Sequence, residues 1–575
     1  MTKKNLLRRG CILLISASAG WLTSCAPTVV TNYSTTNVDR NLHSAVVQVR
    51  DILKHQDENA ERPVAKLLQA IENCKNDSEI SGLCLLTAEG AWQRLKTRPG
   101  DKVVLDLYNA AVEKFFEING LALARHSQNL DFPTASGKVY RVKTEEFNPP
   151  KHPGLALSYV VSSGITIKGF QQRSVVPGIG VPLVAPVLIP HDNPKYARFY
   201  PQQRSIARSM NALLIFDRKG NVTARVSDTT RNTNIVVGKT RLPLATDTTA
   251  PLAFSMQGMN DWKIGLLGLL QPLEARREGG LYLVAPFDSE KIPVLLIHGL
   301  SASPLMWRNL SAELSMDETI RKKYQFLAAY YPSGMNIPVI RRMLNQWYGD
   351  FLETFDPEGT SPASKNLIII GHSMGGVLGR ALAKDTTNQA VWDAFLKVPP
   401  DQIKIPRKQK HLITDTLIWE PLTPLDQGIY IAAPHHGSKL ADSRPAQWVV
   451  TLIKMPLQLV EFPIDLMTKI TPMLRSGDSL LKNATSISNL SPEYPLYPAL
   501  DKSPDKPGYI YHSIIGERGS PHNPRFNDGV VPYSSAHLPG AASEFVIHAN
   551  HLNIANNKNT IEEVRRILTK DKAKK

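Results

Sequence analysis

Apolar residues are spaced differently in three parts of this 575-residue chain, and the first part has the spacing of helices. Between residues 39 and 130, apolar side chains recur every three or four positions, which places them on one face of a helix. Two sets show this spacing: Val64, Leu67, Leu68 and Ile71, and Val104, Leu107, Ala111 and Phe115. Residues 39–130 are therefore predicted to form a helical region whose apolar stripes build a core.

Short apolar runs replace the helical period between residues 131 and 275. Three of them resemble strands: residues 156–161, 212–216 and 222–226. The segment 218–221, between the last two, is typical of a hairpin turn. Segment 177–190 contains several Pro, Gly and Val residues, which favours an irregular loop or a sheet edge. The pattern predicts a small β-rich domain over residues 131–275.

Strand-like and helix-like segments alternate from residue 276 to residue 575. The predicted strands are residues 293–297, 324–331, 367–370, 428–432, 509–515 and 544–547, and residues 345–355 form a predicted helix. This alternation favours a mostly parallel sheet with helices on both faces. We therefore expect an α/β domain at residues 276–575, preceded by the helical region and the β-rich domain.

The first 24 residues have the features of a secretory signal peptide. A basic segment, residues 3–9, precedes a short apolar run, residues 11–22. The run ends in Leu22-Thr23-Ser24-Cys25, which resembles the lipobox of bacterial lipoproteins. The resemblance implies cleavage before Cys25, acylation of its thiol, as with palmitate, and a tether over residues 25–38. A plain signal peptide with an incidental cysteine is the alternative.

The residue after Cys25 is alanine rather than aspartate. By the sorting habit of bacterial lipoproteins, this implies the outer membrane of the cell envelope. No other apolar run in the sequence approaches the ~20 residues that cross a bilayer. The N-terminal lipid is therefore the expected membrane anchor.

The composition is that of a globular protein, with 42% hydrophobic and 21% charged residues. The formal net charge is +16, and removal of the signal takes away four of the positive charges. The remaining Lys and Arg residues are scattered, apart from the last few residues, so we expect general surface charge and no nucleic-acid partner.

Cys74 and Cys84 remain once Cys11 and Cys25 are assigned to the signal and the lipid. The two are close in sequence and would enter an oxidising compartment, so a disulfide between them is predicted. Two buried thiols are the alternative.

The strongest chemical signal is Gly371-His372-Ser373-Met374-Gly375 between a strand of Leu and Ile residues and a helix-like run. A serine in such a strand-turn-helix is held in a strained conformation that exposes its oxygen above the sheet. The helix that follows directs its N–H groups and positive dipole end at the site. Ser373 is the predicted nucleophile, and an ordinary Gly-rich connection is the alternative.

A serine nucleophile needs a base, an orienting acid and two N–H donors for the oxyanion. The strand at residue 293 ends in His298-Gly299-Leu300, which places a donor at Leu300, and Met374 supplies the second. Near the C-terminus, Asp528 precedes a glycine and His551 follows the last strand. We predict His551 as the base and Asp528 as its partner, with His548 as the competing base.

Residues 290–570 resemble a bacterial lipase-type α/β-hydrolase. Five motifs carry the resemblance: His298-Gly299-Leu300, Gly371-His372-Ser373-Met374-Gly375-Gly376, Ala433-Pro434-His435-His436-Gly437-Ser438 with Ala441-Asp442, Asn527-Asp528-Gly529, and Asn550-His551-Leu552. The family implies Ser373, Asp528 and His551 as the catalytic triad. Lipases of this type often carry a calcium-binding aspartate at the position of Asn553, so calcium is in doubt here.

The segment 441–475 follows a predicted strand at the place where this fold inserts a cap or lid. Its apolar residues have spacings that suit helices over an acyl pocket: Trp448, Val449, Leu452, Met455, Leu459, Phe462, Leu466 and Ile470. A fixed cap and a mobile lid are equally compatible with this pattern.

Together these features predict a lipid-anchored serine hydrolase that cleaves carboxylic esters, lipid-like ones first, without a cofactor or a metal. Acyl transfer to an alcohol on the same fold is one alternative. A non-catalytic scaffolding or binding lipoprotein, with residues 39–260 as its working part, is the other. The partner of the N-terminal regions stays open.

Overall fold

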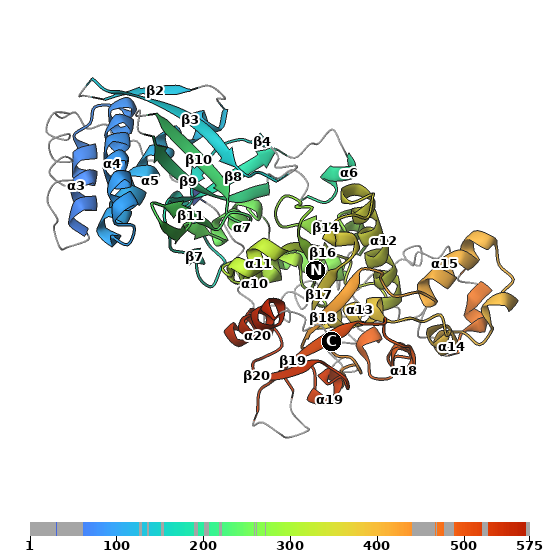
Figure 1. Cartoon of the computed structure of the whole chain (residues 1–575). Coiled ribbons are helices and arrows are strands. Elements are labelled where there is room, and N and C mark those ends of the chain that lie inside the picture. The colour runs from blue at the N-terminus through green and yellow to red at the C-terminus, as the bar shows by residue number, and fades with distance from the viewer. Residues whose placement is uncertain are drawn as a thin grey trace, which may run out of the picture.

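The computed structural model describes residues 30–31, 61–125, 129–134, 137–150, 155–188, 194–200, 206–217, 221–257, 259, 261–270, 272–439, 466, 469–475, 488–519 and 527–570. Two seven-stranded sheets organise this part of the chain (Figure 1). We call the N-terminal one, with its helices, the N-terminal unit, and the other, with its helices, the C-terminal unit. Cys25 and the signal segment lie outside the described residues.

Three helices begin the N-terminal unit: α3 (Glu61–Glu72), α4 (Asp77–Thr97) and α5 (Lys102–Arg125). The predicted stripe Val104, Leu107, Ala111 and Phe115 is buried on α5. On α3 the stripe is turned slightly from the prediction, because Leu68 is 51% exposed and Ala70 is buried instead. The described part of the predicted helical region, residues 61–125, is thus formed by helices, with Leu68 on the exposed face.

The predicted Cys74–Cys84 disulfide is not formed in the structure, where both residues are buried free thiols. The two residues are close in sequence, but helix α4 begins between them at Asp77 and contains Cys84. Asn76 caps this helix through its side chain, which accepts from Glu79 N–H at 3.0 Å. The Cys74 thiol instead donates to Ala70 O at 3.6 Å, and burial raises its pKa to about 11.

The N-terminal sheet has the order β2-β3-β10-β9-β8-β4, with β5 also paired to β8. Its strands are β2 (Leu130–Pro133), β3 (Val139–Phe147), β4 (Leu155–Ala156), β5 (Val160–Val161), β8 (Val181–Leu188), β9 (Ile206–Phe216) and β10 (Val222–Asp228). The predicted strands 212–216 and 222–226 lie in β9 and β10, which pair antiparallel as the hairpin prediction requires.

Segment 177–190, expected to be an irregular loop or an edge, contains the buried strand β8, which lies next to the end of the sheet. The Val181 and Leu183 side chains pack into the core beside β9. On its other edge β8 meets only the two-residue strands β4 and β5, so few ladder bonds are there for its prolines to interrupt.

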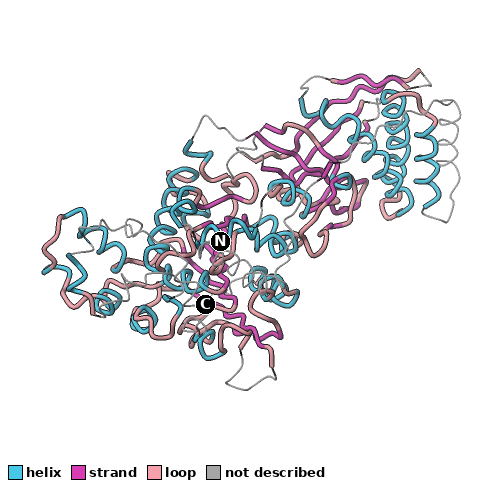
Figure 2. Tube along the Cα trace, turned by 180° about the vertical axis from the view of Figure 1, so that it is seen from behind, coloured by secondary structure: helices cyan, strands magenta, loops and turns pink. Residues whose placement is uncertain are grey.

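The helices and the N-terminal sheet share one hydrophobic core rather than two. Leu107 and Phe115 of α5 pack in the same cluster as Leu213 of β9. The Tyr108 hydroxyl accepts from Leu214 N–H and donates to Leu214 O, both at 2.9 Å. In Figures 1 and 2 the helices cover this sheet at the end of the molecule that is distant from the C-terminal unit.

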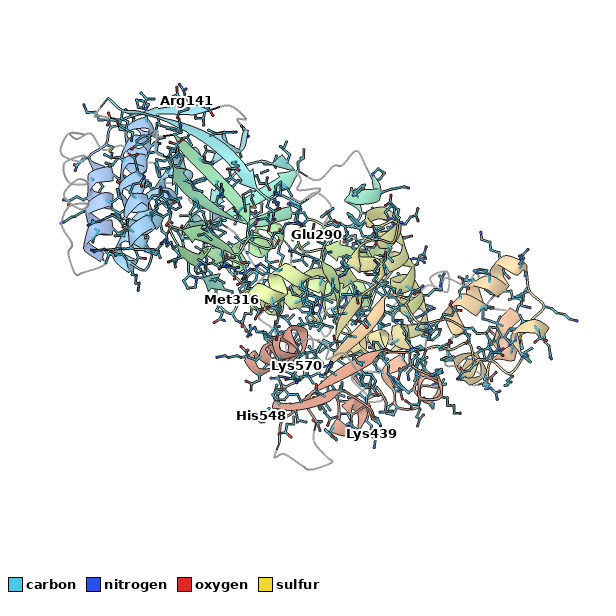
Figure 3. The ribbon with its side chains drawn as sticks, viewed as in Figure 1. Arg141, Glu290, Met316, Lys439, His548 and Lys570 are labelled. Carbon is cyan, nitrogen blue, oxygen red and sulfur yellow. The ribbon has the colours of Figure 1, made fainter. Side chains whose placement is uncertain are left out.

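Shorter elements complete the segment that leads to the C-terminal unit. They are β1 (Val30–Thr31), η1 (Ser162–Gly164), β6 (Ile165–Thr166), β7 (Val175–Val176), α6 (Pro194–Ala197), β11 (Asn234–Val237), β12 (Thr240–Pro243), β13 (Thr246–Asp247), α7 (Thr249–Ser255), α8 (Asp261–Leu270) and α9 (Pro272–Arg277). Ion pairs then tie the units together: Arg231 contacts Asp288 at 2.8 Å and Glu290 at 2.6 Å, and Glu290 lies at this junction in Figure 3.

The C-terminal sheet has the order β14-β16-β15-β17-β18-β19-β20. The strands are β14 (Gly280–Leu283), β15 (Ile292–Ile297), β16 (Tyr324–Tyr330), β17 (Leu367–His372), β18 (Leu425–Ile431), β19 (Ile510–Glu517) and β20 (Ser543–His548). The six predicted strands are confirmed to within a few residues and pair in parallel. The short antiparallel edge strand β14 was not predicted.

Helices cover both faces of this sheet, as the alternation predicted, and bury two hydrophobic clusters. They are η2 (Pro304–Trp307), α10 (Arg308–Leu314), α11 (Glu318–Lys323), α12 (Ile337–Phe355), η3 (Pro362–Ser364), α13 (Met374–Ala383), α14 (Ala390–Phe395), η4 (Pro400–Gln402), α15 (Arg407–Leu417), η7 (Thr471–Met473), η8 (Ser488–Leu490), α18 (Leu496–Lys502), α19 (Tyr533–Ala536), η9 (Ile554–Asn556) and α20 (Lys558–Thr569). Among the described helices, none is both long and apolar enough to cross a membrane.

Most of the predicted cap segment lies outside the described residues, including Trp448, Val449, Leu452, Met455, Leu459 and Phe462. Leu466 and Ile470 of that segment are buried in the core cluster on one face of the C-terminal sheet. Helices α14 and α15 were not predicted. They follow α13 in the chain and extend to one end of the molecule in Figure 1.

Candidate active site

Ser373 occupies the sharp turn between strand β17 and helix α13. Its φ is 53° and its ψ is −125°, a conformation that L residues rarely adopt. The turn is this tight because the neighbouring residues lack side chains: a Cβ on Gly371 would stand 2.4 Å from Gly375 O. A Cβ on Gly375 would stand 2.1 Å from Ile297 O of β15. The local sequence thus places the serine oxygen at the carboxyl edge of the sheet.

His551, from the loop after β20, contacts both Ser373 and Asp528. Its Nε2 lies 2.9 Å from Ser373 Oγ, and its Nδ1 lies 2.6 Å from Asp528 Oδ2. An ionised carboxylate only accepts hydrogen bonds, so Nδ1 carries the proton and Nε2 accepts from the serine hydroxyl. The three predicted residues, 178 positions apart at the extremes, therefore form one hydrogen-bonded chain.

Asp528 is held by its own loop after β19. The carboxylate is 1% exposed, and its Oδ1 accepts N–H bonds from Val530 at 2.9 Å and Val531 at 2.7 Å. Its backbone oxygen accepts from His551 N–H at 2.9 Å. Asp528 thus orients the His551 imidazole through both its side chain and its main chain.

The two predicted oxyanion donors lie at the starts of the turns that surround Ser373. A Cβ on Gly299 would stand 3.0 Å from Ser373 Cβ, so the loop that carries Leu300 N–H lies directly against the serine. Met374 begins helix α13. Within the described residues, neither the Leu300 nor the Met374 N–H donates to a protein acceptor. Both N–H groups are therefore available to a substrate oxygen.

His548, the competing base, does not approach the serine. It ends strand β20 with an exposed side chain, as Figure 3 shows at the edge of the molecule. The loop that follows turns His551 inward, where it is 7% exposed. The structure therefore joins His551, and not His548, to Ser373.

Sequence reasoning missed the contact made by His372, although this residue precedes the nucleophile in the motif. Its Nε2–H donates to His551 O at 2.9 Å, and the two rings stand 4.9 Å apart. Burial, and then the nearby His551, lower the pKa of His372 to about 3. His372 is thus a neutral donor that fixes the main chain of His551.

His298 is fully buried and stacks on Tyr331 with ring centroids 4.2 Å apart. Burial lowers its pKa to about 4, so the ring is neutral at pH 7.

The motif at 433–438 supports the loop of Asp528. Ser438 Oγ donates to Val530 O at 2.6 Å, and Val530 N–H in turn donates to the Asp528 carboxylate. Ser535 Oγ donates to Gly437 O, also at 2.6 Å. The motif at 433–438 thus supports the loop that carries Asp528 and does not itself contact Ser373 or His551 in these hydrogen bonds.

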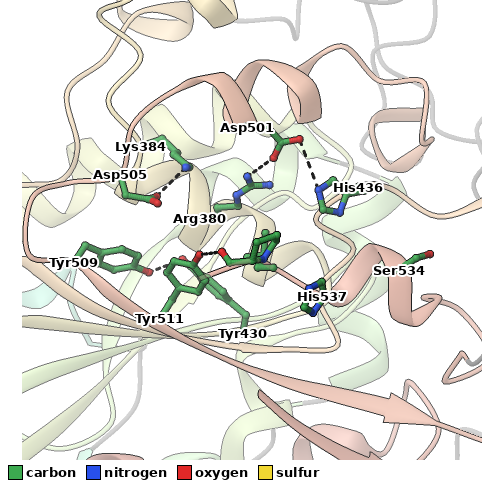
Figure 4. Close-up of a pocket in the computed structure, with 12 residues that line it drawn as sticks. Arg380, Lys384, Tyr430, His436, Asp501, Asp505, Tyr509, Tyr511, Ser534 and His537 are labelled. Carbon is green, nitrogen blue, oxygen red and sulfur yellow. Dashed lines mark hydrogen bonds and ion pairs between the residues drawn. The ribbon is translucent and has the colours of Figure 1, made fainter. Parts of the chain in front are cut away.

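A cavity of about 410 Å³ lies away from the serine, beside α13 and α18 (Figure 4). Its cations are already paired: Lys384 Nζ lies 2.9 Å from Asp505 Oδ1, and Arg380 pairs with Asp501. It is lined by Arg380, Lys384, Tyr430, His436, Asp501, Asp505, Tyr509, Tyr511, Ser534, His537, Leu538 and Pro539. Ser373, Asp528 and His551 do not line this cavity, so we assign it no part in chemistry at the serine.

The described residues contain no group of three or more His, Cys, Asp or Glu side chains placed to hold a metal ion. Asn553, at the position of the family's calcium-binding aspartate, precedes the short helix η9 and donates its N–H to Asn550 Oδ1 at 3.0 Å.

Residues 288–394 match the family model described as the PGAP1-like alpha/beta domain. The matched part contains Leu300, Ser373 and Met374, whereas Asp528 and His551 lie beyond it. No curated protein matches the chain.

Several solved structures resemble this chain over about half of its length. The mature form of a Bacillus licheniformis lipase is 17% identical and matches over 50% of this chain and 98% of its own, with a TM-score of 0.32. A Staphylococcus hyicus lipase is 14% identical over 49% of this chain and 93% of its own, with a TM-score of 0.28. The sheet order, the turn at Ser373 and the matched family model make the C-terminal unit α/β-hydrolase-like.

Proposed function

We propose that this protein hydrolyses carboxylic esters through an acyl-enzyme on Ser373. The observation that supports this best is the position of His551, whose two ring nitrogens bind Ser373 Oγ and the buried Asp528 carboxylate. A serine hydroxyl is a weak nucleophile unless a base of this kind removes its proton.

In the proposed reaction, Ser373 Oγ attacks the ester carbonyl carbon while His551 Nε2 takes the hydroxyl proton. The carbonyl oxygen becomes an oxyanion that accepts from the N–H groups of Leu300 and Met374. His551 then gives the proton to the alcohol oxygen as the C–O bond breaks. Water, deprotonated by His551, next attacks the acyl-enzyme carbonyl. The bond between the acyl carbon and Ser373 Oγ then breaks, His551 returns the proton to Ser373 Oγ, and the carboxylic acid is released.

The substrate class we propose is lipid-like esters at a membrane. This rests on the signal and the lipobox-like Leu22-Thr23-Ser24-Cys25, which favour a lipid anchor at Cys25 and the bacterial outer membrane. Cys25→Ser is expected to release the protein from the membrane fraction. A variant that still sediments with membranes contradicts the lipid anchor and leaves the ester chemistry untouched.

A fluorophosphonate probe and a panel of p-nitrophenyl esters of increasing acyl length test the chemistry. We expect the native protein to be labelled at Ser373 and to turn over esters, and Ser373→Ala to do neither. His548→Ala is the matched control and should behave as the native protein does. Folded native protein that neither reacts with the probe nor cleaves any ester contradicts the proposal and favours a scaffolding role.

A further inference from the structure

Helix α8 lies against two loops at the carboxyl edge of the C-terminal sheet, although it precedes this unit in sequence. A Cβ on Gly265 would stand 2.4 Å from Ser301 O and 3.1 Å from Ser301 C. Farther along the helix, Gly268 O accepts from Gly334 N–H at 3.0 Å. The helix backbone is therefore in direct contact with the loop after β15 and with the loop after β16.

The first of these loops carries the proposed oxyanion donor. Ser301, the residue after Leu300, has a φ of 57°, and its N–H donates to Ser333 Oγ at 3.2 Å. Ser301 is thus held by the β16 loop through its N–H and by α8 through its carbonyl. Ser301 O belongs to the peptide unit 301–302 and Leu300 N–H to the unit 299–300, with a single peptide unit between them, so a displacement of Ser301 O is expected to reach the Leu300 N–H through this short turn.

We propose that α8 sets the position of the Leu300 N–H, and that Gly265 is the positioning residue. A side chain at 265 meets backbone atoms of Ser301, which cannot rotate away as the tip of a flexible side chain could. Close-packed contacts of this kind transmit small displacements. The inference rests on the proposed function, because it assigns the segment between the two sheets a part in oxyanion binding.

The helix offers a matched pair of substitutions. Gly265→Ala brings a methyl group within 2.4 Å of Ser301 O, whereas Gly268→Ala brings one no closer than 3.5 Å to Tyr331 O, an ordinary contact. Both replace a glycine by alanine in the same helix, three residues apart. A difference between them therefore reports the contact with Ser301 and not helix propensity.

We expect Gly265→Ala to lower kcat at least tenfold with little change in KM, and Gly268→Ala to stay within twofold of the native enzyme. Binding of a trifluoromethyl ketone, whose adduct places an oxyanion in the same site, should weaken by the same factor as kcat/KM. A general loss of stability would not produce that parallel. Equal kinetics for the two variants overturn the proposal.

Hydrogen–deuterium exchange of the peptide covering residues 299–303 keeps the test separate from the proposed function. If the native protein cleaves no ester, the proposed chemistry fails, and exchange alone decides the positioning. Faster exchange in Gly265→Ala than in Gly268→Ala supports it, and equal exchange overturns it. Should Gly265→Ala not fold, Gly334→Ala replaces it, because a Cβ there would stand 2.4 Å from Leu269 O and displaces α8 from the other side.

Discussion

The two seven-stranded sheets differ in where their backbones are strained. Three of the described non-glycine residues with positive φ, Ser301, Ser373 and Ala432, follow the adjacent strands β15, β17 and β18 of the C-terminal sheet. Beside the N-terminal sheet, Asn148 is the one described residue of this kind, and asparagine tolerates that conformation well. Strain therefore collects at the edge where we propose the reaction, as it does at many functional sites.

The two units also differ in their buried polar groups. In the N-terminal sheet, Arg208 Nη2 lies 2.6 Å from Glu146 Oε1 and 3.1 Å from Asp228 Oδ2. Burial opposes ionisation of Asp228, but Arg208 and Lys291 together hold its pKa below the usual value. At the C-terminal site, the buried Asp528 carboxylate instead faces His551, and His372, which burial keeps neutral, donates to His551 O. The first arrangement stabilises the fold, and the second leaves the proposed base, His551, available to take a proton.

The largest expected effect comes from the proposed triad. Ser373→Ala and His551→Ala should each lower kcat by ~10³- to 10⁶-fold, and the double variant little further, since such residues act as a unit. Asp528→Asn should cost about 10⁴-fold, because the amide favours the wrong imidazole tautomer. Ester turnover of each variant is measured, with circular dichroism as the folding check. Full turnover by Ser373→Ala, or loss of activity in His548→Ala alone, would contradict these assignments.

Arg208→Met tests the other half of the comparison. Removing one partner of this buried cluster should lower the free energy of unfolding by about 3–5 kcal/mol, since Asp228 is left without its main counter-ion. Arg141→Met is the control, because its pair with Asp131 is more than half exposed and should matter by less than ~1 kcal/mol. Urea unfolding measures both. A fall in kcat of the folded Arg208→Met enzyme would show that the N-terminal cluster also serves the chemistry.

The buried histidines predict a loss of stability in acid. Burial lowers the pKa of His298 to about 4, of His372 to about 3 and of His512, on β19, to about 4. In the unfolded chain these rings take protons near pH 6.5, so the unfolded state binds more protons as the pH falls. Their contribution is complete above that pH and is lost toward pH 4, by about 1 kcal/mol per histidine between pH 6 and 5. Urea midpoints across this range measure it, and His512→Asn should reduce the slope by one proton.

His372→Phe should act on turnover more than on folding. The ring volume is kept, but His551 O loses its donor, at a cost of about 1–3 kcal/mol for an unsatisfied buried group. We expect kcat to fall about tenfold at constant KM, since the imidazole is less well fixed. Steady-state kinetics and a thermal melt separate the two effects. A lower melting temperature with unchanged kcat would reduce His372 to a packing residue.

The smallest predicted effect is that of glycine on stability, and it has opposite signs in the two sheets. Ser373→Gly should be more stable than Ser373→Ala by about 1 kcal/mol, because glycine adopts a positive φ without strain. Ala212→Gly, in the middle of β9, should instead destabilise by about 1 kcal/mol or more, since glycine adds freedom to the unfolded chain and removes a buried methyl group. Thermal or urea unfolding decides both signs. Equal stability of the two residue 373 variants would mean that the turn stores no strain.

The sequence by itself determined the local conformations of the C-terminal unit. Runs of branched apolar residues placed β15, β16 and β17, and glycines beside Ser373 placed the sharp turn, because short-range sterics and side-chain period act within a few residues. The order of Ser373, Asp528 and His551 along the chain, which is the order that α/β-hydrolases use, indicated the proposed triad. The local conformations need no knowledge of distant segments.

Only the tertiary structure decided which distant segments meet. Proline and glycine made 177–190 resemble a loop, yet burial beside β9 makes it the strand β8. The two cysteines stay buried free thiols with the start of α4 between them, and His372 binds His551 across 179 positions. The contact of α8 with the Leu300 loop is of the same kind. Such contacts depend on how whole units pack, which the period of a single segment does not encode.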